Sequence, residues 1–428
     1  MSTESDSTRL AAVAQDHVQS ERLRQAIADL AAFGGRSDGG VSRQTLTPTD
    51  LRARQDLVAR ARAMGCEVFI DDCANLFFRR AGLTDAPAVL TGSHADTQPV
   101  GGKLDGAYGV VAGLEVIQAL NDAGVQTRRP IEVVAWTNEE GSRFGPGCMG
   151  SSAFVDPTRL AGYREVRDAE GISFGQAVDL ALQEMPDVPR RALQQPLAAY
   201  VELHIEQGPV LERAGVPLGI VNGIQSVRWF RVKATGVAAH AGTTPMEVRA
   251  DAMAACIAVA HQLQTEAARH HDRQLRLTMG RWVVSPNSIN TIAGEVEFTI
   301  DIRCVDAQVL SEFEAFIRAT LAAHAWAGQI AIERIFERQP TRFPAPMLAL
   351  VRQACERASR KAGQAAPIEL TSGAFHDAMY LADHCPSSMI FVPSKYGISH
   401  NAAEETAHSE LVLGAQALAY AVTALAQG

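Results

Sequence analysis

Strand-like and helix-like segments alternate through the first third of the chain, and this alternation limits the folds open to it. Residues 88–91 form a short apolar run that ends in a Gly-Ser-His turn. Residues 110–120 form an apolar helical segment, and 131–136 form a second apolar run. Strand–helix–strand order of this kind predicts a largely parallel sheet with right-handed crossover connections. Such sheets carry functional side chains at the carboxyl ends of their strands. We therefore expect an α/β domain.

The pattern of expected strands and helices changes near residue 215. Beyond it, strand-like segments with partial alternation of apolar and polar residues are interleaved with helical segments. The strand-like segments are 226–234, 276–284 and 295–304, and the helical segments are 249–266 and 310–323. This order is typical of a compact four-stranded α+β domain. The pattern then returns to the α/β type, so we expect one domain inserted into another.

The length of the chain agrees with two domains. Single cores stop growing near about 250–300 residues, and the chain has 428. The predicted larger domain is discontinuous, comprises residues 1–214 and 334–428, and has a mixed, mostly parallel sheet flanked by helices. The predicted smaller domain comprises residues 215–333.

Composition excludes several classes of protein. The net charge of -9 and the lack of a Lys/Arg run argue against a nucleic-acid or anionic-membrane partner. The polar, acidic N-terminus lacks the features of a signal peptide, and no apolar run approaches the roughly 18–20 residues of a spanning helix. The seven cysteines are scattered without a C-x-x-C motif, which indicates reduced thiols. We expect a cytoplasmic protein without a membrane or nucleic-acid partner.

Histidines and carboxylates gather in five short segments. These are GSHADT (92–97), GGKLDG (101–106), TNEEG (137–141), ELHIEQG (202–208) and GISHN (397–401). Imidazole nitrogens and carboxylate oxygens bind divalent ions such as zinc, and a catalytic site leaves one position open for water. Two such ions sharing a carboxylate activate water and polarise a carbonyl. The segments therefore indicate a two-metal hydrolytic site, which zinc, manganese, cobalt or nickel would suit.

The spacing within two of these segments suggests separate roles. His94 and Asp96 would share a face of a strand, or Asp96 would turn back to orient the imidazole of His94. The adjacent Glu139 and Glu140 point in different directions, so one can bind metal while the other takes a proton from water. Each signal has an ordinary alternative, since a lone histidine is more often structural and a Glu-Glu pair more often begins a helix.

Taken together and in order, the motifs resemble those of the M20-type metallo-amidohydrolases. The chain is most similar to their subgroup of N-carbamoyl-L-amino-acid hydrolases, β-ureidopropionases and allantoate amidohydrolases. The motifs that carry the resemblance are GSHADT (92–97), GGKLDGAYGVVAGLEV (101–116), TNEEGSRFGPGCMGS (137–151), ELHIEQGPVLE (202–212), HAGTTPM (240–246), PNSINTIAGEVEFTIDIR (286–303) and KYGISHNAAEET (395–406). They span most of the chain.

The resemblance implies a role for each polar residue of the larger domain. One metal would be held by His94, Asp105 and His204, and the other by Asp105, Glu140 and His400, with Asp105 bridging. Glu139 would be the general base and Asp96 the residue that orients His94. The family typically places a cis peptide beside the bridging aspartate, here expected at Asp105–Gly106. The larger domain would then be catalytic and the smaller one a lid and dimerisation domain.

Substrate-binding candidates come from both domains. Arg303 ends a predicted strand and would clamp a substrate carboxylate, or it forms an ion pair with Asp301 or Asp306. Asn290 would contact the same carboxylate, or it caps a turn. By resemblance, His240 would stabilise the oxyanion from the partner subunit, which makes the homodimer necessary for activity.

Two further substrate-binding candidates lie in the larger domain. Gln207 would project to the side of His204 if that segment is helical. His376, with Asp377, lies in a loop that resembles the family's SGAGHDA, where Phe375 replaces a glycine. Lys395 and Tyr396 would shape the pocket or be ordinary rim residues.

The resemblance implies hydrolysis of the ureido C–N bond of an N-carbamoyl-L-amino acid, a small substrate with a carboxylate, by a water activated between two metals. The alternatives are an allantoate amidohydrolase and a β-ureidopropionase. Less favoured are an aminoacylase or dipeptidase, whose usual motifs differ from HIEQGP and HAGTTPM. A non-catalytic binding paralogue would have lost Glu139 or a metal ligand, and all of these are present.

Overall fold

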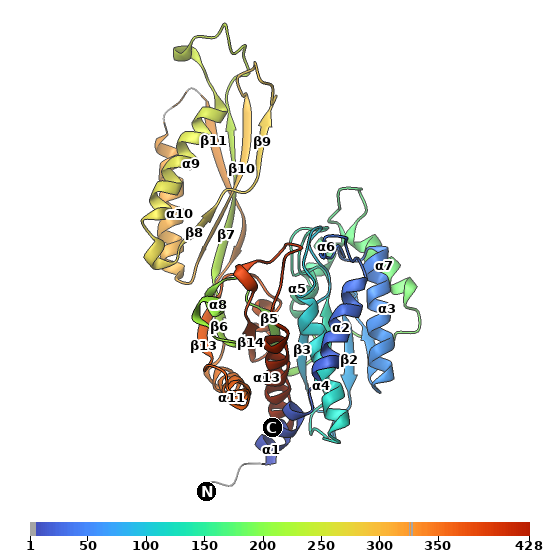
Figure 1. The fold of residues 1–428 in the computed structure, drawn as a ribbon. Coiled ribbons are helices and arrows are strands. Elements are labelled where there is room, and N and C mark those ends of the chain that lie inside the picture. The colour runs from blue at the N-terminus through green and yellow to red at the C-terminus, as the bar shows by residue number, and fades with distance from the viewer. Residues whose placement is uncertain (1–5, 325, 327) are drawn as a thin grey trace. The chain divides into compact units, whose positions relative to one another are not determined.

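The computed structural model describes residues 6–324, 326 and 328–428, which form two compact units. The larger unit contains the residues up to Gly223 and from Arg342 onward, and the smaller unit is Ile224–Thr341. Each unit has its own sheet and its own hydrophobic core (Figure 1). The predicted α/β class with an inserted α+β domain is therefore confirmed.

The sheet of the larger unit has nine strands. They are β1 (Glu67–Ile70), β2 (Leu76–Arg80), β3 (Ala88–His94), β4 (Ile131–Trp136), β5 (Leu197–Ile205), β6 (Gly219–Ile224), β12 (Thr341–Arg342), β13 (Ile368–Ser372) and β14 (Ser387–Val392). Their order is β1-β2-β4-β3-β5-β14-β6-β12, and β13 pairs with β6. The four central strands are parallel, whereas β1, β2 and β6 pair in the antiparallel sense. The parallel centre brings the carboxyl ends of β3, β4 and β5 to one edge.

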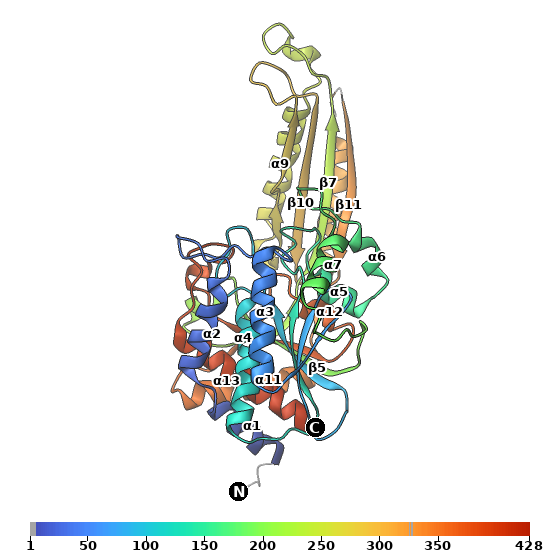
Figure 2. The ribbon, with the colours of Figure 1, turned by 90° about the vertical axis from the view of Figure 1, so that its right-hand side faces the viewer.

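Helices cover both faces of this sheet. They are α1 (Asp6–Asp16), α2 (Ser20–Ala32), α3 (Pro48–Ala63), α4 (Ala107–Asp122), α5 (Met149–Val155), α6 (Arg159–Arg164), α7 (Phe174–Glu184), α8 (Val210–Ala214), α11 (Ala345–Lys361), α12 (Ala378–Leu381) and α13 (His408–Gln427) (Figure 2). Side chains alternate between the faces of a strand. The side chain of Leu203 in β5 therefore lies against Gly414 of α13, while its neighbour Glu202 accepts a hydrogen bond from Ala378 at the start of α12.

Among the described residues, α13 is the one helix that is long and apolar enough to pass for a membrane span by length and composition. The expectation that no apolar segment approaches the length of a membrane span is therefore wrong by length and composition. The segment is not obvious in the sequence, because Glu410 and later polar residues interrupt its apolar residues. Two thirds of its most apolar window, 67%, is buried inside the protein. The helix packs against α1, α4 and α11, as a core helix does.

The smaller unit is a sheet covered by two helices. Its strands are β7 (Ser226–Thr235), β8 (Arg276–Thr278), β9 (Trp282–Ser285), β10 (Glu295–Cys304) and β11 (Gln329–Arg338), and its helices are α9 (Ala252–Ala268) and α10 (Ala307–Ala323). Apolar residues alternate along β10, and its buried positions form the core with both helices. β8 and β9 pair with different parts of β10, so five strands fill four positions. The predicted strand 276–284 is thus interrupted.

The units divide slightly later in the chain than the limits expected at 215 and 333. β6 follows the expected first limit but pairs with β14 of the larger sheet. β11 continues past the second limit and pairs with β7 of the smaller sheet. The chain leaves and re-enters the larger unit at neighbouring points, since Phe343 N donates to Asn222 O at 3.2 Å.

Candidate metal centre

Six predicted metal-site residues lie together at the carboxyl edge of the larger sheet. His94 is the last residue of β3, His204 is the penultimate residue of β5, and Glu139 and Glu140 follow β4. Asp105 lies in the turn before α4, and the remaining ligand, His400, lies in the loop before α13. Parallel neighbours β3, β4 and β5 end at the same edge, which is why residues far apart in the sequence meet there.

Asp105 lies between two groups of ligand-capable atoms. Its Oδ1 is 3.3 Å from His204 Nε2 and 3.7 Å from His94 Nε2. Its Oδ2 is 3.2 Å from His400 Nε2, which is 3.3 Å from Glu140 Oε2. Within each group the atoms lie within 4.8 Å of one another. Imidazole and carboxylate donors in two groups joined by one carboxylate fit a pair of bridged divalent cations.

A third group contains Glu202, His204 and His376. It is a poorer metal site, because both oxygens of Glu202 already accept hydrogen bonds. Ser93 Oγ donates to one at 2.6 Å and Ala378 N to the other at 2.8 Å. Glu202 is therefore a structural carboxylate that ties β3 and α12 to β5.

The charges of the site favour bound cations. Burial, together with the carboxylate of Asp105, raises the pKa of Glu140 to about 7. Burial also raises the pKa of Glu139 well above its usual value, aided by Asp377 and Glu140. Burial opposes ionisation of Asp105, but hydrogen bonds from three histidines outweigh it and hold its pKa well below the usual range. Carboxylates are thus crowded in a buried space where positive ions would relieve their repulsion.

Backbone carbonyls orient the two buried histidines. His94 Nδ1 lies 3.0 Å from Asp96 O, and His204 Nδ1 lies 2.9 Å from Ile205 O. Each Nδ1–H therefore donates to a carbonyl, so the lone pair of each ring is on Nε2, on the side of Asp105. In this structure His204 Nε2 accepts from Gly106 N at 3.1 Å. The carboxylate of Asp96, predicted to orient His94, is 3.7 Å from its Nδ1. It accepts instead from the backbone N–H groups of Glu139 and Glu140, at 3.3 and 3.4 Å.

Glu404 holds the bridging aspartate, and sequence reasoning missed it. This buried carboxylate accepts hydrogen bonds from Leu104 N at 2.8 Å and Asp105 N at 3.1 Å. Its other oxygen accepts from Ser399 Oγ at 2.9 Å, next to His400. Glu404 therefore links the two loops that carry Asp105 and His400. The available signal was its place in the matched segment KYGISHNAAEET.

Gln207 lies beside the metal centre, but not on a helix. β5 ends at Ile205, and Gln207 takes a left-handed conformation with φ 57. The segment is therefore not helical, and the condition for Gln207 to share a helical face with His204 is not met. The turn directs the Gln207 amide to Asp105, where Nε2 donates to Oδ2 at 2.9 Å.

Gly106 was given no role in the sequence beyond the expected cis peptide with Asp105. It has φ 61, and a Cβ atom at this position would lie closer than 3.0 Å to three atoms of the His94 ring. The cis peptides among the described residues are Gly145–Pro146 and Ser285–Pro286, so the expected cis peptide at Asp105–Gly106 is absent. The glycine turns the chain here by its positive φ instead.

His376 packs against His204, one of the proposed metal ligands. Its ring contacts the His204 ring edge-on at 4.5 Å between centroids, and its Nε2 lies 2.9 Å from Ser372 Oγ. Burial, together with the neighbouring His204, lowers the pKa of His376 well below its usual value, so it is neutral. Asp377 is also buried, whereas Lys395 pairs with Glu405 and Tyr396 is exposed. The candidate rim residues thus face solvent.

The predicted residues of the smaller unit fall at opposite ends of its sheet. His240 pairs with Thr291, and Ala241 N donates to Asn290 O at 3.0 Å, so His240 and Asn290 are neighbours. Arg303 lies near the other end of β10, opposite Val227. It forms a bidentate ion pair with Asp301, with Nε–Oδ1 and Nη2–Oδ2 distances of 3.0 and 2.8 Å.

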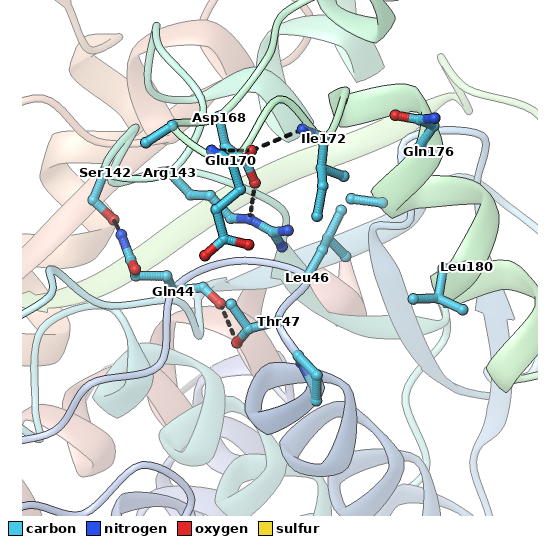
Figure 3. A pocket seen from close by; sticks show the side chains of 13 residues that line it. Gln44, Leu46, Thr47, Ser142, Arg143, Asp168, Glu170, Ile172, Gln176 and Leu180 are labelled. Carbon is cyan, nitrogen blue, oxygen red and sulfur yellow. Dashed lines mark hydrogen bonds and ion pairs between the residues drawn. The ribbon is translucent and has the colours of Figure 1, made fainter.

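A separate hollow of about 680 Å³ lies in the larger unit (Figure 3). Its walls come from the loop before α3, from the loop after Glu140, and from α7 and the segment preceding it. Arg143 and Asp168 form an ion pair of 3.0 Å in this wall. Gln44 Nε2 donates to Ser142 Oγ at 3.4 Å, and Ser142 donates to Thr97 O at 3.2 Å. None of the predicted metal or substrate residues lines this hollow.

Comparisons with known proteins give relatives that cover nearly the whole chain. The model of peptidase family M20/M25/M40 matches residues 90–424. An N-carbamoyl-L-amino acid amidohydrolase from Geobacillus stearothermophilus is 42% identical, over 96% of this chain and 100% of its own. An allantoate amidohydrolase from Escherichia coli is 37% identical, over 94% of this chain and 98% of its own. The crystal structure of a hydantoinase/carbamoylase family amidase from Burkholderia vietnamiensis has a TM-score of 0.87 at 40% identity, covering 96% and 98% of the two chains.

Proposed function

The chain belongs to peptidase family M20/M25/M40, and from this premise we propose that it hydrolyses the ureido C–N bond of an N-carbamoyl-L-amino acid. The observation that carries the proposal is the pair of ligand groups joined by Asp105, with Glu139 beside them and outside both. Such an arrangement leaves one carboxylate free for proton transfer. The products are the amino acid, ammonia and carbon dioxide.

The residues present suit two divalent cations, zinc, manganese, cobalt or nickel. His94, Asp105 and His204 would hold one, and Asp105, Glu140 and His400 the other. When bound, such ions lower the pKa of water and polarise the carbonyl of the substrate. That is the chemistry that the side chains of this chain cannot supply alone.

Glu139 is the proposed general base. Its Oε2 lies 3.5 Å from His94 Nε2, on the side where the ligand atoms converge. Glu139 takes a proton from water as the water oxygen bonds to the ureido carbon. The C–N bond to the amino acid then breaks, and Glu139 returns the proton to the leaving nitrogen. The remaining carbamate decomposes to ammonia and carbon dioxide.

Arg303 and Asn290 are the proposed contacts for the substrate carboxylate. A guanidinium group matches a carboxylate in a bidentate geometry. Asp301 holds the Arg303 guanidinium in place through two of its nitrogens. Gln207 and His376 complete the proposed substrate-binding set. Gln207 is next to Asp105, and His376 backs His204.

His240 is the proposed donor to the oxyanion. Its Nδ1 accepts hydrogen bonds from Gly242 N at 3.0 Å and Thr243 N at 3.3 Å. The ring proton of the neutral imidazole is therefore on Nε2, on an exposed side chain, where it can donate. A donor of this kind stabilises the charge that develops on the carbonyl oxygen.

The separation of His240 from Arg303 supports a homodimer. From Glu295 to Arg303, β10 alone spans about 26 Å at 3.3 Å per residue, and His240 and Asn290 lie beyond the Glu295 end. One small substrate cannot touch both ends of this strand. We therefore propose that His240 and its neighbour Asn290 reach the site from a second copy of the chain. Exposed apolar side chains near His240 suit such a contact, namely Val237, Met246, Val248 and Ile289.

Allantoate is the second candidate substrate, because the relative from Escherichia coli is similar over nearly its whole length. It also carries a ureido group and a carboxylate, as does N-carbamoyl-β-alanine, the substrate of a β-ureidopropionase. An aminoacylase or dipeptidase is less favoured, because the usual motifs of those enzymes differ from HIEQGP and HAGTTPM. A non-catalytic binding paralogue is also less favoured, because Glu139 and every proposed metal ligand are present. We place the enzyme in the cytoplasm, since its seven cysteines are free and buried. We propose no membrane or nucleic-acid partner, since the net charge is -9 and no Lys/Arg run is present.

A hydrolysis panel tests the proposal. N-carbamoyl-α-amino acids, N-carbamoyl-β-alanine, allantoate and N-acyl amino acids are each incubated with protein loaded with manganese, zinc, cobalt or nickel. We expect the highest kcat/KM for a carbamoyl-L-α-amino acid, and its loss in Glu139→Gln. Preference for allantoate would replace the proposed substrate with the second one. Undiminished turnover in Glu139→Gln would overturn the general-base role.

A further inference from the structure

The thiol of Cys148 touches the proposed general base. Cys148 Sγ lies 3.5 Å from Glu139 Oε1, and the thiol is placed to donate to that oxygen. The other oxygen, Oε2, faces His94 Nε2 at 3.5 Å. The two oxygens of Glu139 thus have different neighbours, a thiol on one side and the metal ligands on the other.

The backbone fixes Cys148 in this place. Cys148 N donates to Glu139 O at 2.9 Å, and Gly150 N donates to Thr137 O at 2.8 Å, so the two ends of the loop are joined. Cys148 has φ 53, a left-handed conformation that is uncommon for a residue with a side chain. Only 2% of Cys148 is exposed. The residue therefore contacts Glu139 through both its main chain and its side chain, and water has little access to the thiol.

We propose that Cys148 is a positioning residue for Glu139. The Cys148 thiol holds one oxygen of the Glu139 carboxylate and so directs the other oxygen toward the proposed metal ligands. The inference rests on the proposed role of Glu139 as the base. A carboxylate on two rotatable methylenes has several orientations, and proton transfer requires one of them. A thiol is a weak donor. It therefore orients the carboxylate with little change to its basicity, and a hydroxyl in the same place would give a similar orientation.

Burial and the carboxylate of Glu139 keep this thiol in its donor form. Burial raises the pKa of Cys148 well above its usual value, and the nearby Glu139 raises it further. A protonated thiol in a closed space is also a poor nucleophile. Cys148 therefore acts through Glu139 and does not itself react with the substrate.

Three variants separate this role from simple packing. Cys148→Ala removes the donor, Cys148→Ser replaces it with a hydroxyl donor, and Cys73→Ala makes the same deletion at a neighbouring buried thiol. Cys73 Sγ faces the Met149 carbonyl at 3.7 Å and does not contact Glu139. For Cys148→Ala we expect kcat to fall roughly 10- to 100-fold with KM within about twofold. For Cys148→Ser and Cys73→Ala we expect kcat within about threefold of the parent.

The S–H stretch in the infrared spectrum tests the contact without relying on turnover. In metal-loaded protein, the parent-minus-Cys148→Ala difference spectrum should contain one S–H band, at lower frequency than ordinary buried thiols show. In a Glu139→Gln background this band should move to higher frequency, because a neutral acceptor binds the thiol less strongly. Metal content, measured in every variant, should stay unchanged.

The outcomes distinguish this inference from the proposed function. If the parent hydrolyses no substrate of the panel, the proposed function fails. If the parent is active but Cys148→Ala has an unchanged kcat, the positioning role is wrong. It is also wrong if the frequency of the S–H band does not change in the Glu139→Gln background. An equal loss in Cys73→Ala would show that packing under the loop is the cause, and would also overturn it.

Discussion

A single glycine, Gly106, determines how closely the chain can approach His94, a proposed metal ligand. Gly106 turns the backbone directly against the imidazole of His94, in the space that any side chain would need. The bridging carboxylate of Asp105 precedes it, so the position of Gly106 sets the distance between a ligand on β3 and the ligand shared by both groups. The constraint is therefore steric as well as conformational.

We predict that Gly106→Ala lowers metal affinity roughly 10- to 100-fold, because His94 must move away from its place. The matched control is Gly124→Ala. Gly124 has a nearly identical φ of 62, but nothing lies within 4 Å of the added carbon. Calorimetric titration with zinc or manganese measures both variants. If Gly124→Ala loses as much metal affinity as Gly106→Ala, backbone strain and not the contact with His94 is responsible.

At the scale of elements, a buried amide holds the loop that carries Glu139 and Glu140. Asn75 Oδ1 accepts from Thr137 N at 2.9 Å, and Asn75 Nδ2 donates to Gly150 O at 3.1 Å. Asn75 is itself held by the buried carboxylate of Asp71, at 2.8 Å. The end of β4 and the start of α5 are thus joined through one side chain from the neighbouring turn.

We predict that Asn75→Ala lowers the free energy of unfolding by about 2–3 kcal/mol, since it leaves a buried N–H, a buried carbonyl and a buried carboxylate without this partner. Urea denaturation measures the change. Asn121→Ala is the control, because Asn121 also donates to a backbone carbonyl, that of Met64, but is exposed. We expect less than about 0.5 kcal/mol there. A similar loss in both variants would contradict the role of burial.

The sequence predicted the strands and helices better than it predicted the contacts of single residues. The apolar runs 88–91 and 131–136 became β3 and β4, and the alternation at 295–304 became β10. The parallel order then explained why His94, Glu140 and His204 meet. The sequence did not reveal that Asp96 O, and not its carboxylate, orients His94, because a backbone contact leaves no mark in residue type. It did not reveal the turn at Gln207 or the three hydrogen bonds of Glu404, which depend on distant loops.

At the scale of the whole molecule, we predict that two inactive variants restore each other. Glu139→Gln retains His240, and His240→Ala retains Glu139. If His240 acts across a dimer, a mixed dimer has one site with both residues intact. Random exchange makes half of the dimers mixed, so co-refolded or co-expressed protein should recover about one quarter of the parent activity.

Glu139→Gln mixed with Glu139→Ala is the control for this complementation, and it should remain inactive. The oligomeric state is measured on the same samples by light scattering. A monomer, or a mixture as inactive as its components, would show that His240 does not act from a second copy.

The smaller unit enters and leaves the fold through paired strands, with Val227 opposite Arg338. Recombination at these two adjacent points would exchange the whole segment as a cassette. Such an exchange would transplant Arg303, Asn290 and His240 together, while every metal ligand stayed with the host. The proposed carboxylate and oxyanion contacts are therefore inherited separately from the proposed metal ligands and from Gln207 and His376. Hybrids between relatives would show how much of the substrate choice the exchanged segment carries.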